Sequence, residues 1–379
     1  MARHWTINGR FLTQPVTGVQ RYALEIVRAL DQLIGEGHPA TRDLKLDLAV
    51  PPGGRCEPPL KAIPLQIVGH AGGQAWEQCS LPAATRGRGL INLCNTAPLA
   101  HDRAIVCIHD LNTRIAPQSY RSAFRLYYRA LMPMLGRRAR SIVTVSEYSA
   151  SQLEAFGIAP RSKISVIPNG HEHALRWRAR HTAQTRAAAS PSTIVLIGSP
   201  APHKNARLIL ELAPQLRALG LKIAVVGVSD PNVFSSNSRR IEADNIVWLG
   251  RVNDAGLAAL LKDSLCLAFP SLTEGFGLPP LEAMALGCPV VAADCASLPE
   301  VCGEAALYAS PHDPTAWINA FQWLKADPSL RQQLLASGQQ RLARFRWRRS
   351  AEDYLRLFAA LDNVPWIGDD VPVLPAAAE

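Results

Sequence analysis

The sequence lacks any apolar run near the ~20 residues that a membrane-spanning helix needs. Its N-terminus also lacks the apolar stretch of a secretory signal. None of its eight cysteines pair in CxxC spacing, and no pair of histidines completes a zinc pattern. We therefore expect a cytoplasmic protein with reduced thiols and no structural metal. Peripheral attachment to the inner face of the plasma membrane stays open.

Negative charge is scarce in the N-terminal half. Residues 1–190 carry 24 Lys or Arg against 12 Asp or Glu, whereas residues 191–379 carry 16 against 19. The whole positive excess of the chain, a net charge of +9, therefore lies in the first half. This asymmetry indicates an anionic partner, for which nucleic acid and an anionic membrane surface are both candidates. The apolar fraction of 48% is typical of a globular enzyme.

Short apolar runs alternate with amphipathic stretches in both halves, which predicts parallel sheets covered by helices. We expect an N-terminal domain over 1–172, a linker over 173–192, a second domain over 193–345, and a C-terminal helix with an irregular tail over 346–379. Each domain is predicted to be Rossmann-like, with ligands at the carboxyl ends of its strands. The predicted strands are 44–50, 90–94, 103–109, 141–146, 164–168, 193–199, 222–228, 245–250, 265–271 and 289–294.

The most informative stretch is 268–294, which reads strand, loop, helix, strand. Gly275 and Gly277 allow backbone amides to come close to a ligand. Two prolines follow at the predicted helix start, where a missing N–H costs little and the free amides can hold a diphosphate. Glu274 and Glu282 would repel bare phosphate, so we expect them to accept hydrogen bonds from sugar hydroxyls, Glu282 from the ribose and Glu274 from the transferred hexose.

The motif EGFGLPPLE resembles the Glu-x7-Glu motif of family 4 retaining glycosyltransferases, which have the GT-B fold of two facing Rossmann-like α/β domains with a ligand cleft between them. A capped helix after a glycine turn, with both glutamates solvated, is the alternative. The resemblance implies catalytic roles for His109, Glu274 and Lys204. It implies that the donor is bound by Gly18, Lys204, Arg251, Glu274, Gly275, Phe276, Gly277, Leu278 and Glu282.

Further motifs extend the resemblance over most of the chain. GSPAPHKN is similar to the family loop after the first strand of the second domain, and its Lys204 matches the lysine that neutralises the donor diphosphate. Many relatives carry Arg where this chain has Ser199, so a second positive charge must come from elsewhere; Arg251 is a candidate. QPVTGVQRYALEI places Gly18 where relatives let a loop approach the donor phosphates.

His109 follows a predicted strand in CIHDLN. In relatives a histidine here touches the transferred sugar or the reacting oxygen, and a structural bond to Asp110 is the alternative. NLCNTAPL resembles a loop on the acceptor side, which implies roles for Asn95 and Thr96. VSEYSASQL and VIPNGH also match family stretches.

No Asp-x-Asp element stands at a strand end, so we expect a metal-independent enzyme that needs no cofactor. The predicted reaction moves a hexose from a nucleotide-sugar to a polysaccharide or polyprenyl-diphosphate-linked oligosaccharide precursor. Resemblance to bacterial mannosyltransferases of polysaccharide assembly favours mannose, and GDP-mannose over UDP-sugars. The sequence leaves open front-face or double-displacement chemistry. It also leaves open a sugar-nucleotide epimerase or another GT-B enzyme such as a phosphorylase.

The segment 121–140 carries six arginines and no acidic residue. Arg121, Arg125 and Arg129 recur every four residues and share one helical face. We expect this face to bind an anionic membrane surface, with a packed helix and solvated arginines as the alternative. A basic nucleic-acid-binding protein is the alternative to an enzyme. No recognised nucleic-acid-binding module is present in the sequence, so we expect no nucleic acid partner.

Overall fold

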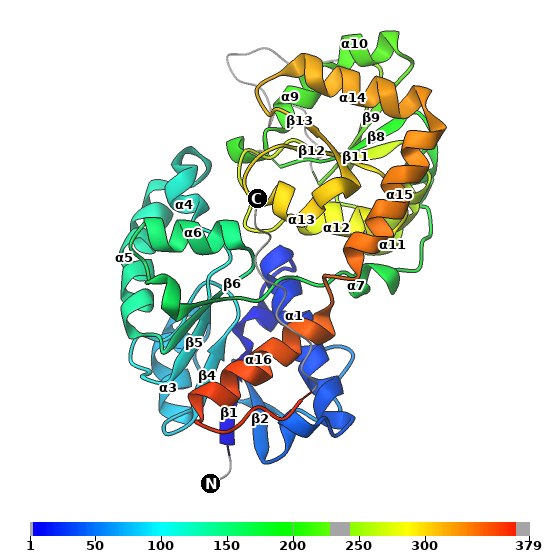
Figure 1. Cartoon of the computed structure of the whole chain (residues 1–379). Helices are drawn as coiled ribbons and strands as arrows, with labels where there is room; N and C mark the ends of the chain where they lie inside the picture. The colour runs from blue at the N-terminus through cyan, green and yellow to red at the C-terminus, as the bar shows by residue number, and fades with distance from the viewer. Residues whose placement is uncertain (1–2, 200, 228–242, 369–379) are drawn as a thin grey trace. The chain divides into compact units, whose positions relative to one another are not determined.

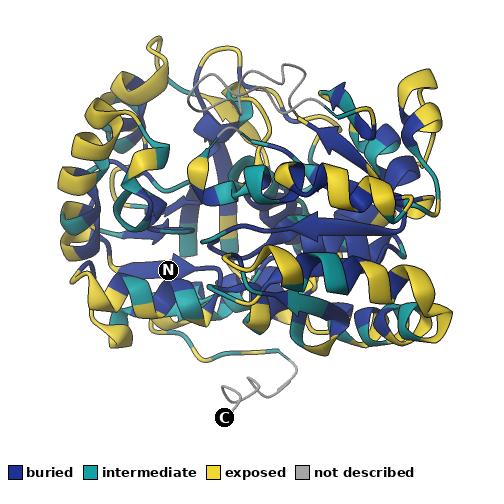
Figure 2. Ribbon diagram, turned by 90° about the horizontal axis from the view of Figure 1, so that it is seen from above, coloured by how far each residue is buried: buried dark blue, intermediate teal, exposed yellow. Residues whose placement is uncertain are grey.

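The computed structural model describes residues 3–199, 201–227 and 243–368. The last residues of the predicted tail, 369–379, lie outside this set. The chain divides into two compact units, 1–106 with 348–379, and 107–347. Figure 2 shows the strands as largely buried and the helices as exposed on one side, the burial pattern of α/β layers.

Seven strands of the described chain form one sheet, in the order β3-β2-β1-β4-β5-β6-β7. The pairs of β1 with β2 and β4, of β2 with β3, of β4 with β5, and of β6 with β7 are parallel. Parallel pairing needs a crossover between neighbours, as strand–helix alternation in the sequence predicts. The strands are β1 (Arg3–Asn8), β2 (Leu44–Val50), β3 (Leu65–Ile67), β4 (Gly89–Asn92), β5 (Ala104–Cys107), β6 (Ser141–Thr144) and β7 (Ile164–Val166).

Six further strands in the described residues form the second sheet, in the order β10-β9-β8-β11-β12-β13, all parallel. Residues 173–192, predicted as the linker, lie between the last strand of the first sheet and the first strand of the second. The two parallel α/β sheets confirm the predicted fold class. The strands are β8 (Thr193–Ile197), β9 (Lys222–Val226), β10 (Ile246–Gly250), β11 (Cys266–Phe269), β12 (Val290–Ala293) and β13 (Ala306–Ala309).

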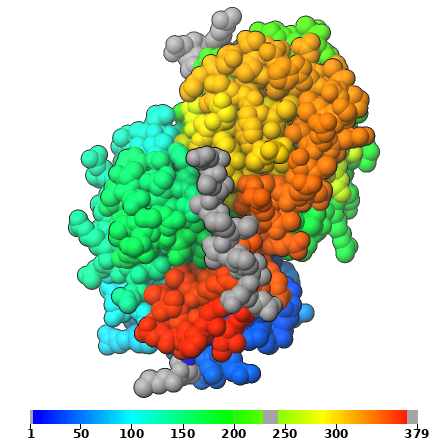
Figure 3. Space-filling view, in the orientation of Figure 1, coloured from blue at the N-terminus to red at the C-terminus, as the bar shows by residue number. Residues whose placement is uncertain are grey.

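The first unit is held together by large aromatic side chains. Trp5 of β1 stacks on Phe358 of α16 (Trp347–Leu361) with a centroid distance of 4.8 Å. Tyr22 of α1 (Gly18–Gly35) and Tyr354 of α16 share a hydrogen bond of 3.1 Å between their buried hydroxyls. The end of the chain therefore packs on its beginning, and α16 runs beside β1 and α1 in Figure 1. In Figure 3, α16 appears in red on the surface of this unit. The remaining helices of the unit are α2 (Gly73–Ala75) and α3 (Leu81–Ala84).

The second unit places helices against its sheet: α14 on β12 and β13, α12 on β11 and β12, and α10 on β9. The stretch 206–220 forms two helices rather than one, because Pro214 lacks the N–H that would continue the first. Its helices are α4 (Asn112–Ile115), α5 (Ser122–Arg138), α6 (Glu147–Ala155), α7 (Glu172–Leu175), α8 (Ala183–Ala188), α9 (Ala206–Glu211), α10 (Ala213–Ala218), α11 (Asp254–Lys262), α12 (Leu278–Ala285), α13 (Leu298–Cys302), α14 (Pro314–Ala326) and α15 (Pro328–Leu342).

Candidate active site

The EGFGLPPLE motif lies where β11 ends and α12 begins. Gly277 has a φ of 105°, in the left-handed region that favours glycine, and turns the chain into the helix. Pro279 and Pro280 occupy the first turn of α12, where no backbone N–H is needed for the helix ladder. The local sequence thus produces a sharp loop followed by a helix start.

Gly275 approaches the segment after β5 so closely that no side chain fits. A Cβ at this position would lie 2.3 Å from the carbonyl oxygen of His109. The glycine therefore brings the loop of the motif against the residue that the sequence predicts to be catalytic. The sequence explained this glycine by approach to a ligand, whereas the described structure gives it a protein neighbour.

Three serine hydroxyls hold the loop by its carbonyl groups. Ser297 donates to the carbonyls of Glu274 (3.1 Å) and Phe276 (2.9 Å). Ser146 and Ser149 both donate to the carbonyl of Gly275, at 2.6 and 3.1 Å. Sequence reasoning missed these three residues, although two of them belong to VSEYSASQL, which it had matched to the family.

The structure brings together two predicted residues from separate motifs, Lys204 and Glu274. Lys204 follows β8, and its Nζ lies 2.7 and 2.9 Å from the two carboxylate oxygens of Glu274. The Lys204 side chain is 30% exposed and that of Glu274 11%. A cation and a hydrogen-bond acceptor thus stand side by side at the loop before α12. The N-terminal dipole end of this helix favours anions, although Pro279 and Pro280 carry no N–H.

Two titratable groups beside this pair have shifted pKa values. Burial, together with the charge of Lys204, lowers the pKa of His203 to about 4, so its ring is neutral near pH 7. The ring of His203 stacks on Tyr120 at a centroid distance of 5.9 Å. Desolvation raises the pKa of Asp110, and the charge of Glu274 raises it further, against the lowering effects of the Asn112 amide and of Lys204. Perturbed groups of this kind cluster at functional sites. Neither residue was selected from the sequence.

His109 is buried directly after β5. Its Nε2 lies 3.6 Å from the Sγ of Cys107, and its carbonyl accepts a hydrogen bond from Ser149 at 2.9 Å. The carboxylate of Asp110, its sequence neighbour, accepts the backbone N–H of Asn112 at 2.8 Å. His109 therefore lies against the Gly275 loop through its backbone.

Glu282 lies in α12, and its carboxylate meets a histidine that sequence reasoning did not select. The Oε1 of Glu282 is 2.8 Å from the Nε2 of His173, and both side chains are buried. His173 belongs to α7, so the contact joins two helices of the same unit. The one sequence signal that could have selected His173 is its position just after the motif VIPNGH.

Of the remaining residues predicted on the donor side, two are buried and one is exposed. Phe276 and Leu278 are buried, and the ring of Phe276 packs edge-on against Phe345 at 5.4 Å. Their side chains therefore shape the loop. Arg251 is exposed directly after β10. The hydroxyl of Ser199 accepts the N–H of Ala201 at 3.3 Å.

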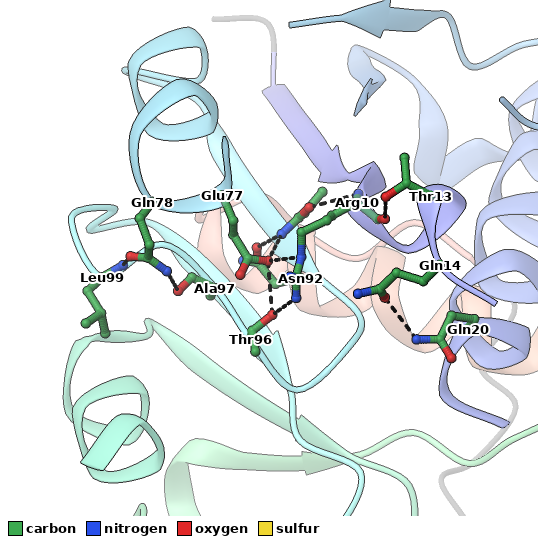
Figure 4. Close-up of polar contacts among 11 residues, drawn as sticks. Arg10, Thr13, Gln14, Gln20, Glu77, Gln78, Asn92, Thr96, Ala97 and Leu99 are labelled. Carbon is green, nitrogen blue, oxygen red and sulfur yellow. Dashed lines mark hydrogen bonds and ion pairs between the residues drawn. The ribbon is translucent and has the colours of Figure 1, made fainter. Parts of the chain in front are cut away.

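Three predicted residues of the N-terminal half, Gly18, Asn95 and Thr96, belong to the first unit, whereas His109 belongs to the second. Gly18 is exposed at the first position of α1, and a Cβ there would meet nothing within 4 Å. Asn95 has a φ of 60°. Thr96 is buried, and its hydroxyl accepts from Arg10 at 2.7 Å and donates to Glu77 at 3.0 Å (Figure 4). Arg10 and Glu77 form a buried ion pair of 3.2 Å.

A second residue of the segment 76–80 also holds the predicted acceptor loop. Gln78, next to Glu77, donates to the carbonyl of Ala97 and accepts from the N–H of Leu99, both at 3.0 Å (Figure 4). The glutamine bonds and the Thr96 bonds together reach three positions of the loop, Thr96, Ala97 and Leu99. The loop is therefore rigidly tied to the helical segment 76–80.

The described residues offer neither a cluster of metal ligands nor a membrane-spanning helix. Residues 3–199, 201–227 and 243–368 contain no group of three or more His, Cys, Asp or Glu side chains placed to hold a metal ion. No helix in the same ranges combines the length and apolarity that crossing a bilayer requires.

Two family models match the chain: "Glycosyl transferases group 1" over residues 191–327 and "Glycosyltransferase Family 4" over residues 85–175. Together they span more than half of the chain. The first match contains the Lys204–Glu274 pair and the second contains His109.

Two similar mannosyltransferases agree with these matches. The chain is 27% identical to the O-antigen chain mannosyltransferase RfbU of Salmonella typhimurium over 62% of this chain and 64% of that protein, a little under two thirds of its length. It is 28% identical to O-antigen chain mannosyltransferase B of Escherichia coli over 88% and 93%.

A solved structure resembles the fold. Anabaena HepE, determined in complex with UDP and glucose, superposes with a TM-score of 0.66 at 15% identity, covering 95% of this chain and 100% of that one. At this identity the likeness shows the GT-B fold alone. Fold, motifs and family models agree, and the chain belongs to the family 4 glycosyltransferases.

Proposed function

We propose that this glycosyltransferase moves a hexose, with retention of anomeric configuration and without a metal ion, from a nucleotide-sugar to a polysaccharide or polyprenyl-diphosphate-linked precursor. Mannose from GDP-mannose is the proposed donor substrate. The observation that carries the proposal is the Lys204–Glu274 pair at the loop before α12. It supplies one cation for a diphosphate and one carboxylate for sugar hydroxyls in the same place.

The proposed reaction assigns a task to each group. The acceptor oxygen bonds to the anomeric carbon as the bond from that carbon to the diphosphate breaks, and the electron pair leaves with the diphosphate. The hydroxyl proton passes to the departing phosphate oxygen. Lys204 and the N-terminal dipole end of α12, with the N–H groups that remain beside Pro279 and Pro280, stabilise the charge that develops there. Glu274 holds hydroxyls of the hexose, Glu282 holds the ribose, and His109 guides the reacting groups.

The choice of donor rests on the similar proteins. Two of them are named as O-antigen chain mannosyltransferases. HepE, by contrast, was determined with UDP and glucose, so a protein of this fold binds a sugar other than mannose. The base pocket is proposed to include Arg251 and the end of β10, which would contact the base largely through backbone groups.

A basic pocket in the second unit supports an acceptor that is presented at an anionic lipid surface. Arg114, Arg125 and Arg129 line a cavity of about 650 Å³ beside α5, with Leu126 and Phe156 as its apolar part. Among the described residues that line it, none is acidic. Desolvation, and after it the neighbouring charge of Arg129, lowers the pKa of Arg114. We propose that this face binds the anionic lipid surface at which the acceptor is presented.

Calorimetry and thermal-shift measurements with GDP-, UDP- and dTDP-sugars test the donor assignment, since a ligand that binds the native state raises its melting temperature. We expect GDP-mannose to bind tightest, and Glu282→Ala to abolish most of the shift. A protein that binds none of these donors, although folded, would contradict the proposed function. Tight binding of a UDP-sugar alone would correct the donor and leave the class of reaction standing.

A further inference from the structure

The carboxylate of Glu282 is held by a buried relay of two further side chains, His173 and Trp347. Nε2 of His173 lies 2.8 Å from Oε1 of Glu282, and Nδ1 of the same ring lies 3.0 Å from Nε1 of Trp347. The exposed fractions of the His173 and Glu282 side chains are 1% and 8%. Trp347 is buried as well. Its ring and that of Trp177 flank the imidazole at 5.7 and 5.5 Å.

The relay fixes the tautomer of His173. An indole N–H can only donate, so Nδ1 of the histidine must be the acceptor. The ring proton of the neutral imidazole then lies on Nε2, which donates it to the carboxylate of Glu282. A neutral donor of fixed direction thereby points at one oxygen of Glu282.

The backbone around the relay is itself fixed. His171 Nδ1 lies 2.7 Å from the carbonyl oxygen of Phe345, and the N–H of Trp347 donates to Glu172 at 3.1 Å. Gly170 has no room for a side chain, because a Cβ there would lie 2.3 Å from the nitrogen of Trp347. Segments 170–173 and 345–347 are therefore clasped together, and His173 has little freedom to turn.

Within the described residues Glu282 has no side-chain partner other than His173, so its Oε2 is available to a ligand. We propose that His173, oriented by Trp347, is a positioning residue of the donor site: it holds Glu282 in the rotamer that accepts the ribose hydroxyls. This inference rests on the proposed function, because it assumes that Glu282 binds ribose. Histidine–carboxylate pairs oriented by a third group position ligands in this way in metal sites as well.

Two substitutions separate the two hydrogen bonds of the imidazole. In His173→Asn the side-chain oxygen replaces Nδ1 and can still accept from Trp347, but nothing reaches Glu282. In His173→Gln the amide nitrogen takes the place of Nε2 and can still donate to Glu282. His173→Asn thus removes the hydrogen bond to the Glu282 carboxylate and His173→Gln keeps it, while both variants lose the aromatic ring.

The experiment measures binding of a nucleoside diphosphate and of its 2′,3′-dideoxy analogue by calorimetry, using GDP and, if it binds more tightly, UDP. The wild-type protein should prefer the ribonucleotide. In His173→Asn this preference should fall about tenfold, the scale of a hydrogen bond to a charged group. His173→Gln should retain most of it. In steady state, His173→Asn should raise the donor KM with little change in kcat.

The outcomes are distinguishable. A wild-type protein that binds no nucleotide contradicts the proposed function. A wild-type protein that binds both nucleotides equally removes the ribose role of Glu282. A His173→Asn variant that prefers the ribonucleotide as strongly as wild type overturns the present inference. If both variants lose the preference equally, in proportion to a lower melting temperature, His173 has a structural role only and the inference also fails.

Discussion

The ammonium group of Lys204 lies within 3 Å of both carboxylate oxygens of Glu274, although 70 residues separate them in the chain. The two belong to loops that follow β8 and β11, which are neighbours in the second sheet. Because the carboxyl ends of adjacent parallel strands meet at one edge, the topology alone brings these loops together. The order of the strands therefore explains why Lys204 and Glu274 lie together. The charges of the two side chains explain what the pair can do.

The first prediction concerns the charge of Lys204. Lys204→Ala should lower kcat by about a hundredfold, the scale observed when one preorganised electrostatic group is removed. Lys204→Arg keeps the charge and should lose less. Initial rates of nucleoside diphosphate release at saturating donor give the comparison. Near-normal turnover of the alanine variant would mean that another cation neutralises the leaving group.

The second prediction concerns the close approach of Gly275. Gly275→Ala should lower both the melting temperature and the activity, because its Cβ would lie 2.3 Å from the carbonyl oxygen of His109. Gly35→Ala in α1 is the matched control, since a Cβ there meets nothing within 4 Å. Calorimetric scans of both variants provide the measurement. An alanine at 275 that leaves stability and rate unchanged would show that the two segments do not touch.

The third prediction concerns the stability of the folded protein at low pH. The folded-state pKa of His203 is about 4, below its ordinary value of 6.5, so the unfolded chain binds the proton first. Its contribution to stability is therefore complete above about pH 6.5 and is lost as the pH falls toward 4. Its neighbours Lys204 and Glu274 act in opposite directions on this pKa.

His203→Gln should consequently lose less stability than wild type between pH 7 and pH 5, as measured by the free energy of unfolding in urea. Asp110, whose pKa is raised, acts with the opposite sign and remains in both proteins, so the difference between them isolates His203. Equal pH dependence in the two proteins would show that His203 takes up its proton as easily when folded.

The fourth prediction concerns the basic pocket beside α5. Wild-type protein should co-sediment with vesicles that contain anionic phospholipid, less so at high salt. Arg125→Glu with Arg129→Glu should abolish co-sedimentation. Both arginines are exposed, so the fold should survive the change. Arg207→Glu in α9, where the arginine side chain is 40% exposed, serves as the charge control. Retained binding in the double variant would move the membrane contact to another surface.

Much of the fold could be predicted because buried parallel strands are continuous apolar runs. All ten strands expected from the sequence are present in the described residues, whereas β1, β3 and β13 were missed. The strand β1 escaped because its apolar Trp5 and Ile7 alternate with His4 and Thr6, and its burial depends on α16 from the other end of the chain. Such long-range packing leaves no local pattern.

The site was predictable only where a motif carried it. Glu274 and Glu282 stand in one short motif, and Lys204 in another. His203 lies inside GSPAPHKN and His173 just after VIPNGH, but their importance comes from burial and from a carboxylate that the fold brings to His173. Thr96, predicted for the acceptor, is joined in the structure to Arg10 and Glu77, residues far away in the sequence. Tertiary hydrogen bonds of this kind cannot be read from spacing.

Transfer of a hexose with retention is tested most directly by the linkage of the reaction product. Purified protein, GDP-mannose and a polyprenyl-diphosphate-linked oligosaccharide are incubated with excess EDTA, and the reaction is followed by ¹H and ¹³C NMR. We predict one GDP released for each new glycosidic bond, an α-linked mannose from the α-linked donor, and no effect of EDTA. A β-linked product, consumption of donor without a new glycosidic bond, or complete loss of activity that Mn²⁺ restores would contradict the account.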